Sequence, residues 1–117
     1  MIKSIAISAL SLGLAVTATA AINTRVVLAE ERMAHEEEGR IITSPIAGID
    51  NHYWYDYRVN VLETQKELAR DLRHASKVKD MRNAWDEYRG ELSHERGHYV
   101  HVMAKRGYHA PSVEVVD

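Results

Sequence analysis

The sequence contains no cysteine, which excludes disulfide bonds, thiolate metal ligands and a cysteine nucleophile. It also lacks phenylalanine, and its two prolines, Pro45 and Pro111, both lie outside the longest apolar patterns. An excess of positive charge is missing too, because 15 basic residues face 17 acidic ones for a net charge of −2. We therefore expect no nucleic-acid partner.

The chain has 117 residues, which is enough for one domain with a small core. Because no disulfide can reinforce so small a core, stability must come from packing between segments or between copies of the chain. This makes a partner or a homo-oligomer an expectation from size alone.

Residues 1–20 have the pattern of a secretory signal peptide. Lys3 forms a short positive region, residues 5–16 are apolar, and residues 18–20 read Ala-Thr-Ala, which fits a cleavage site. The pattern predicts an exported protein, periplasmic or extracellular. The alternative is an uncleaved anchor, because residues 4–22 carry no charge, and only in that case do we expect a membrane attachment.

Residues 21–51 are predicted to form an acidic arm and a linker. Residues 23–39 fit either a short amphipathic helix or a loosely ordered arm, because residues 36–38 place three glutamates where the dipole of such a helix disfavours them. We interpret this acidic run as a solvated surface. Pro45 and Gly48 indicate turns in the linker, whose isoleucines are expected to cover one end of a helical core.

Two long helices are predicted to follow, at about residues 53–75 and 77–106. Asp50 or Asn51 can cap the first helix and Ser76 the second. Apolar residues recur every three or four positions in both helices. The first stripe contains Trp54, Tyr57, Val61, Leu68, Leu72 and Ala75. The second contains Val78, Met81, Trp85, Tyr88, Leu92, Tyr99 and Val102.

The phase of the two stripes predicts an antiparallel helical hairpin over residues 52–108, in an all-α, coiled-coil-like fold. On one continuous helix the stripes point in nearly opposite directions, whereas a fold-back at residues 76–77 turns both inward. This register places Trp54 opposite Tyr99 and pairs Arg58 with Glu95. The remaining residues, 109–117, are expected to be a flexible tail.

The second predicted helix carries a row of histidines that suggests a metal site. His94 and His98 are four residues apart and His101 follows three residues later, so their side chains share one face of the helix. Imidazole nitrogens suit Zn(II), Cu(II) or Ni(II). The sequence therefore proposes His94, His98 and His101 as metal ligands, with a wet surface row and a pH-responsive cluster as alternatives.

Residues 94–98 read His-Glu-Arg-Gly-His, which resembles the zinc-metalloprotease signature H-E-x-x-H. The resemblance implies His94 and His98 as zinc ligands and Glu95 as the base that activates water. The sequence departs from the longer metzincin pattern at His101 and Ala104, where that pattern has glycine and a third histidine.

Taken together, the sequence favours a small exported, non-catalytic helical protein that acts as an interaction or structural module. Its expected partner is a second copy of the chain or an envelope protein. Divalent metal binding through the histidine face is the alternative, and a zinc metallopeptidase is the less favoured third hypothesis.

Overall fold

The computed structural model describes residues 27–110, and these residues form helices and connections without a strand. The all-α prediction is confirmed for this part of the chain. The elements are α2 (Ala29–Glu38), the 3-10 turn η1 (Ile46–Gly48), α3 (His52–His74) and α4 (Val78–Ala104). The predicted signal peptide and most of the predicted tail lie outside the described residues.

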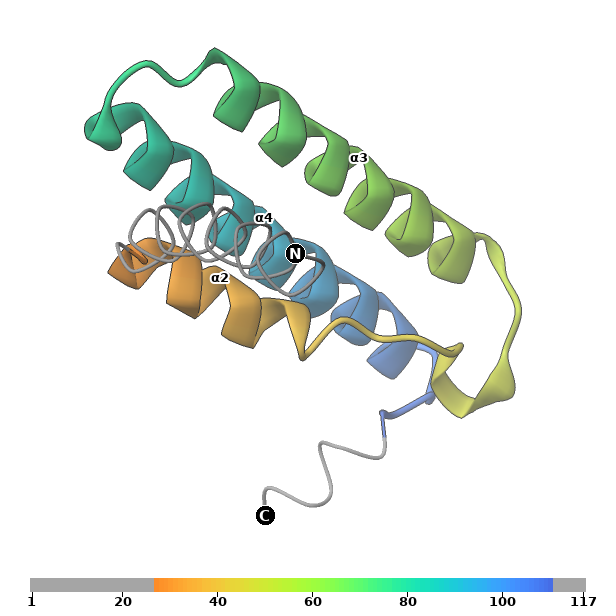
Figure 1. The fold of residues 1–117 in the computed structure, drawn as a ribbon. Coiled ribbons are helices and arrows are strands. Elements are labelled where there is room, and N and C mark those ends of the chain that lie inside the picture. The colour runs from red at the N-terminus through yellow and green to blue at the C-terminus, as the bar shows by residue number, and fades with distance from the viewer. Residues whose placement is uncertain (1–26, 111–117) are drawn as a thin grey trace, which may run out of the picture.

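Helix α4 is the central element, flanked by α2 and α3 (Figure 1). Helix α3 runs beside α4 in the opposite direction, and residues 75–77 connect the two. Helix α2 runs parallel to α4, because Glu30 near its start pairs with Arg82 and Glu37 near its end pairs with Arg96. Within residues 27–110, none of the helices is both apolar enough and long enough to span a bilayer.

The ends of the long helices are set by local hydrogen bonds. The Asn51 side-chain oxygen accepts a bond of 3.1 Å from the Trp54 N–H, so Asn51 is the N-cap of α3. The predicted Ser76 cap of α4 is wrong. The N-cap is Lys77, and the Asp80 carboxylate instead accepts bonds from the N–H and the hydroxyl of Ser76.

The core is aromatic at the end of the molecule opposite the α3–α4 connection. The rings of Tyr57 and Tyr99 stack at 4.9 Å, and Trp54 lies 5.8 Å from Tyr99, as its predicted position opposite that residue requires. Burial raises the pKa of both tyrosines, so both stay as neutral phenols at ordinary pH. Their hydroxyls accept bonds from the N–H groups of Ile42, at 2.9 Å, and Ile46, at 3.0 Å. These bonds hold the linker across the end of the helices.

One predicted side-chain pair between α3 and α4 is not formed. The Glu95 carboxylate accepts a bond of 2.8 Å from the Asn60 amide, not from Arg58. Arg58 lies on a different side of α3, 5.7 Å above the Trp54 ring and next to linker residues 41–42. The expected Arg58–Glu95 pair is therefore wrong, because helix phase turns the arginine away from α4.

The apolar seam does not extend to the α3–α4 connection. Val78 is 57% exposed and Met81 39% exposed, although the pattern predicts both in the buried stripe. Val78 lines an open groove together with Glu30 of α2 and with Lys79, Arg82 and Asp86 of α4, so its described neighbours there are mostly charged.

The start of the predicted flexible tail is packed. Gly107 has a φ of 86°, which lets the chain reverse after α4, and the Tyr108 N–H donates to the Met103 carbonyl at 3.0 Å. Ala110 then contributes to the core, with 7% of its surface exposed. The chain is thus ordered two residues into the segment that the sequence assigns to the tail.

Candidate functional site

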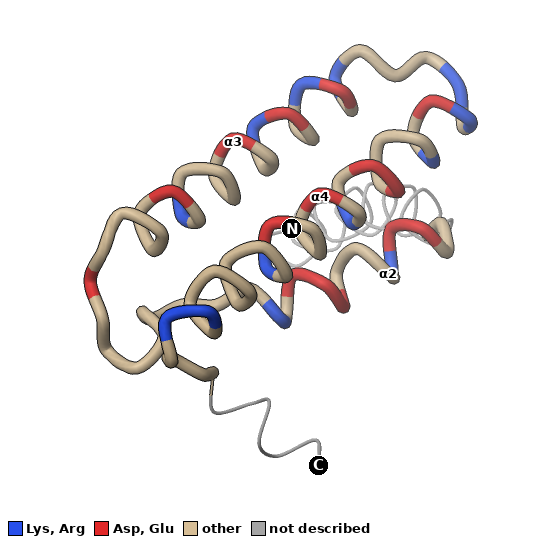
Figure 2. The backbone as a smooth tube through the Cα atoms, turned by 180° about the vertical axis from the view of Figure 1, so that it is seen from behind, with Lys and Arg blue, Asp and Glu red and all other residues tan. Residues whose placement is uncertain are grey.

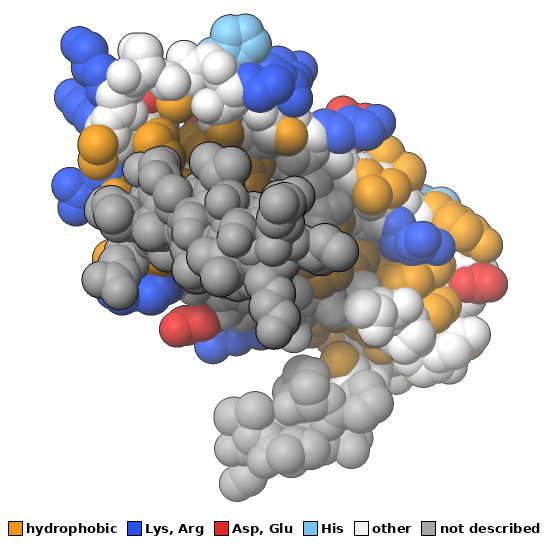
Figure 3. Space-filling view, viewed as in Figure 1, with side chains coloured by type: hydrophobic (Ala, Val, Ile, Leu, Met, Phe, Trp, Pro, Cys, Tyr) orange, Lys and Arg blue, Asp and Glu red, His pale blue; other side chains and the backbone are white. Residues whose placement is uncertain are grey.

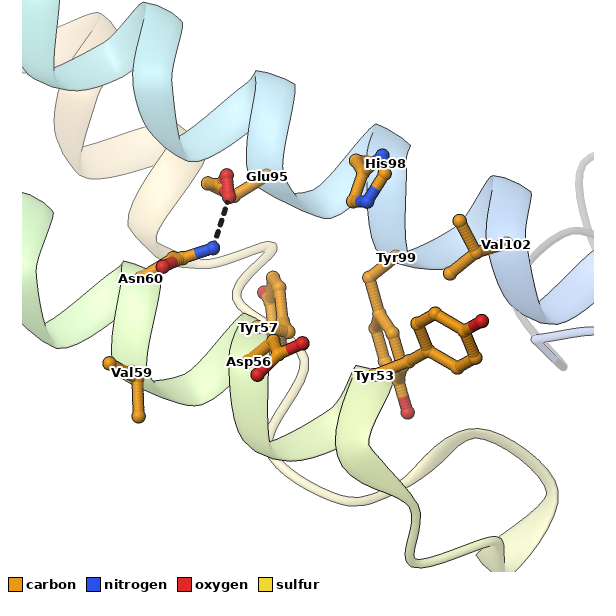
Figure 4. A pocket seen from close by; sticks show the side chains of 9 residues that line it. All are labelled: Tyr53, Asp56, Tyr57, Val59, Asn60, Glu95, His98, Tyr99 and Val102. Atoms are coloured by element: carbon orange, nitrogen blue, oxygen red, sulfur yellow. Dashed lines mark hydrogen bonds between the residues drawn. The ribbon is translucent and has the colours of Figure 1, made fainter.

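The predicted metal ligands lie along an open seam between α3 and α4. His98 lines a groove of about 230 Å³ with Glu95, Asn60 and Tyr53 (Figure 4). His94 lines the neighbouring groove, together with Glu63, Glu67 and Glu91. His101 lines neither of these two grooves, and all three histidines are exposed.

A different set of residues has ligand atoms close together. Within residues 27–110, the one group of three or more such side chains that meets within 4.8 Å comprises Glu67, Glu87 and Glu91. Partial burial and the neighbouring charges of Glu87 and Asp71 raise the pKa of Glu67. Like charges so close together favour protonation of one carboxyl group.

The sequence did not place Glu67 in this group. Glu87 and Glu91 share a face of α4 with the histidines, which the helical spacing shows, but Glu67 comes from α3. Only the register between the two helices brings its carboxylate to them. Spacing within one helix shows which of its residues share a face. It does not show which residues of another helix lie beside them.

The inner residues of the H-E-x-x-H motif make contacts with the two flanking helices. Glu95 accepts its bond from Asn60 of α3. Arg96 donates to the Glu37 carboxylate of α2. The motif therefore lies where α4 contacts both neighbours, and these two side chains join helices in the structure.

The Glu37–Arg96 pair is the least exposed ion pair in the described part of the chain. The Glu37 side chain is 8% exposed and that of Arg96 is 26% exposed, and Arg40 also pairs with Glu37. The interpretation of the acidic run as a solvated surface is therefore wrong for Glu37. A buried carboxylate needs a cation beside it, and helical spacing alone does not indicate which arginine supplies it.

The acidic run contributes a second contact through Glu38. Its carboxylate accepts a bond from the Tyr88 hydroxyl of α4 and lies 2.7 Å from the His35 ring nitrogen. Burial alone would raise the pKa of Glu38, but the bonds from Tyr88 and His35 outweigh it and hold the pKa below its ordinary value. Burial and the Glu38 contact raise the pKa of the Tyr88 phenol.

The largest apolar side chains on the solvent side of α3 form a line. Tyr55, Val59 and Leu62 are 53%, 54% and 52% exposed, and they follow one another four and then three residues apart. This spacing places them on one face of the helix, roughly opposite the seam with α4. We call these three residues the outer face of α3.

Comparison of the chain with family models, with curated proteins and with solved structures gives no match.

Proposed function

We propose that the protein is a small exported, non-catalytic helical module that acts by binding through the outer face of α3. The observation that supports this function is the line of three large apolar side chains, each about half exposed. Leaving such side chains in water is unfavourable, and an apolar line at helical spacing is the usual contact of one helix with another.

A second copy of the chain is the partner that suits this face. Val59 lies between Tyr55 and Leu62, so the line is nearly symmetric about its centre. An antiparallel pair of α3 helices then places Tyr55 of each copy against Leu62 of the other and brings the two Val59 side chains together. Such a two-fold contact is the commonest interface in homo-oligomers.

Sedimentation velocity over a range of concentrations tests this association. The wild-type chain should form a dimer, and Val59→Asp should weaken it at least tenfold, because the change buries a charge at the centre of the contact. Val78→Asp is the matched control, because Val78 is equally exposed but lies at the α3–α4 connection. A wild-type chain that stays monomeric, or equal effects of both variants, would contradict the proposal.

Divalent metal binding is the second candidate, favoured by the position of His94 in the same groove as Glu67 and Glu91. A nitrogen ligand beside carboxylates suits Zn(II). Isothermal titration with Zn(II) should show binding in the wild type that His94→Ala and Glu91→Gln each weaken. His101→Ala is the control on the same helix. Absent binding, or binding that neither variant changes, would exclude this site.

A further inference from the structure

The connection between α3 and α4 is the basic end of the molecule. Residues 70–82 contain five basic side chains against two acidic ones, although the whole chain carries a net charge of −2. The five are Arg70, Arg73, Lys77, Lys79 and Arg82. Figure 3 shows basic side chains gathered over this end, at the upper left, and Figure 2 shows acidic positions distributed along all three helices.

Most of this positive charge is free to meet a partner. Arg82 pairs with Glu30 at 3.2 Å, whereas the other four basic side chains of the segment make no ion pair with residues 27–110. All five are exposed. Of the two acids, Asp80 is held by Ser76 through two hydrogen bonds.

The same end exposes apolar side chains among these cations. Val78 and Met81 are 57% and 39% exposed and lie within the first turn of α4. Lys77 and Lys79 flank Val78 directly in the sequence. Apolar side chains surrounded by lysine and arginine are the combination with which peripheral proteins contact anionic bilayers.

We propose that this basic end docks on an anionic lipid surface. Val78 and Met81 enter the headgroup layer, while Lys77, Lys79 and Arg73 contact lipid phosphates. The charge complementarity favours a lipid surface over one defined anion, because the cations are spread around the end of two helices, and the groove that Lys79 and Arg82 share also carries the acids Glu30 and Asp86. This surface is separate from the outer face of α3, so the inference goes beyond the function proposed above.

Flotation with vesicles tests the inference on the full chain. The measured quantity is the ratio of partition coefficients for vesicles with 30% phosphatidylglycerol and vesicles of pure phosphatidylcholine. The leader carries Lys3 and is identical in every variant, so a change of this ratio between variants reports on the basic end and not on the leader. The ratio should be well above one for the wild type and should fall with added salt.

Lys77→Gln/Lys79→Gln should lower this ratio about 25-fold, because each basic residue near an anionic surface contributes a factor of about five. Lys66→Gln/Lys105→Gln makes the same change in net charge away from this end and should leave the ratio nearly unchanged. Val78→Ser should lower binding, and Met33→Ser, at an exposed position on α2 outside both proposed surfaces, should not.

Three results would overturn the inference. The first is a wild-type ratio near one at low salt. The second is an equal fall of this ratio in the two double-lysine variants, which would show that net charge alone governs binding. The third is binding through this end to an acidic protein with no retention on the anionic vesicles. Circular dichroism of each variant confirms that the helices are intact in every comparison.

Discussion

Glu37 shows most clearly how one side chain changes the interpretation of a whole segment. It is one of three consecutive glutamates, yet it is buried whereas its neighbour Glu36 is exposed. The difference arises because Arg96 and Arg40 both reach the Glu37 carboxylate. The pair holds α2 against α4 at the position of the H-E-x-x-H motif.

Glu37→Gln should therefore lower the free energy of unfolding by about 2 kcal/mol, because it leaves the Arg96 guanidinium partly buried without its anion. Urea unfolding followed by circular dichroism measures the change. Glu36→Gln is the control and should stay within about 0.5 kcal/mol of the wild type, as expected for an exposed side chain. Equal effects of the two substitutions would show that the buried pair contributes nothing particular to stability.

At the scale of elements, α2 depends on charges that titrate. His35 lies 2.7 Å from Glu38 and 3.5 Å from Glu31, and its ring lies 5.2 Å from that of Trp85 of α4. The hydrogen bond with Glu38, assisted by both carboxylate charges, raises the pKa of His35 above its ordinary 6.5 although partial burial opposes the rise. Tyr88 completes the cluster through its bond to Glu38.

The sign of each pKa shift predicts how pH acts on the docking of α2. The raised pKa of His35 gives stability that is complete below pH 6.5 and is lost as the pH rises through the folded value. The lowered pKa of Glu38 gives stability that is present above pH 4.5 and is lost as the pH falls. Docking of α2 should thus be strongest between these two values.

Hydrogen exchange of the α2 amides, corrected for intrinsic rates, measures this response. Protection should be highest between pH 4.5 and 6.5 and should decrease above that interval. His35→Gln should abolish the decrease at high pH while it retains the acid-side loss, which belongs to Glu38. An unchanged response in His35→Gln would assign the titration to another histidine.

The elements themselves were predictable to different degrees. The apolar period defines α3 and α4 to within one or two residues at each end, because apolar residues recur every three or four positions along almost the full length of both helices. The phase of the stripes led us to expect the fold-back. For α2 the sequence fits a helix or an arm equally, because the burial of this segment depends on Arg96 and Tyr88, which lie far along the chain.

The candidate site was predictable only within a single helix. The spacing of His94, His98 and His101 predicts that they share one face of α4, and all three are exposed. Their role as metal ligands stays a prediction. The contributions of Asn60 and Glu67 from α3 depend on which side chains of the two helices meet. Packing details of this kind are not encoded in the periodicity.

At the scale of the whole molecule, the helices leave two different surfaces for partners. The outer face of α3 is apolar and lies away from α4, whereas the α3–α4 connection is basic and carries Val78 and Met81 at its end. The α2–α4 contact uses most of the acidic run. The proposed module would thus use one surface for a second copy of the chain and the other for an anionic bilayer.

The absence of cysteine makes a direct measurement of the central claim possible. Val59→Cys places a single thiol at the centre of the outer face, and Val78→Cys places one at an equally exposed position outside it. Under mild oxidation at micromolar concentration, Val59→Cys should form a disulfide-linked dimer much faster than Val78→Cys, because the proposed two-fold contact brings the two thiols together. Equal rates for both variants would contradict association through α3.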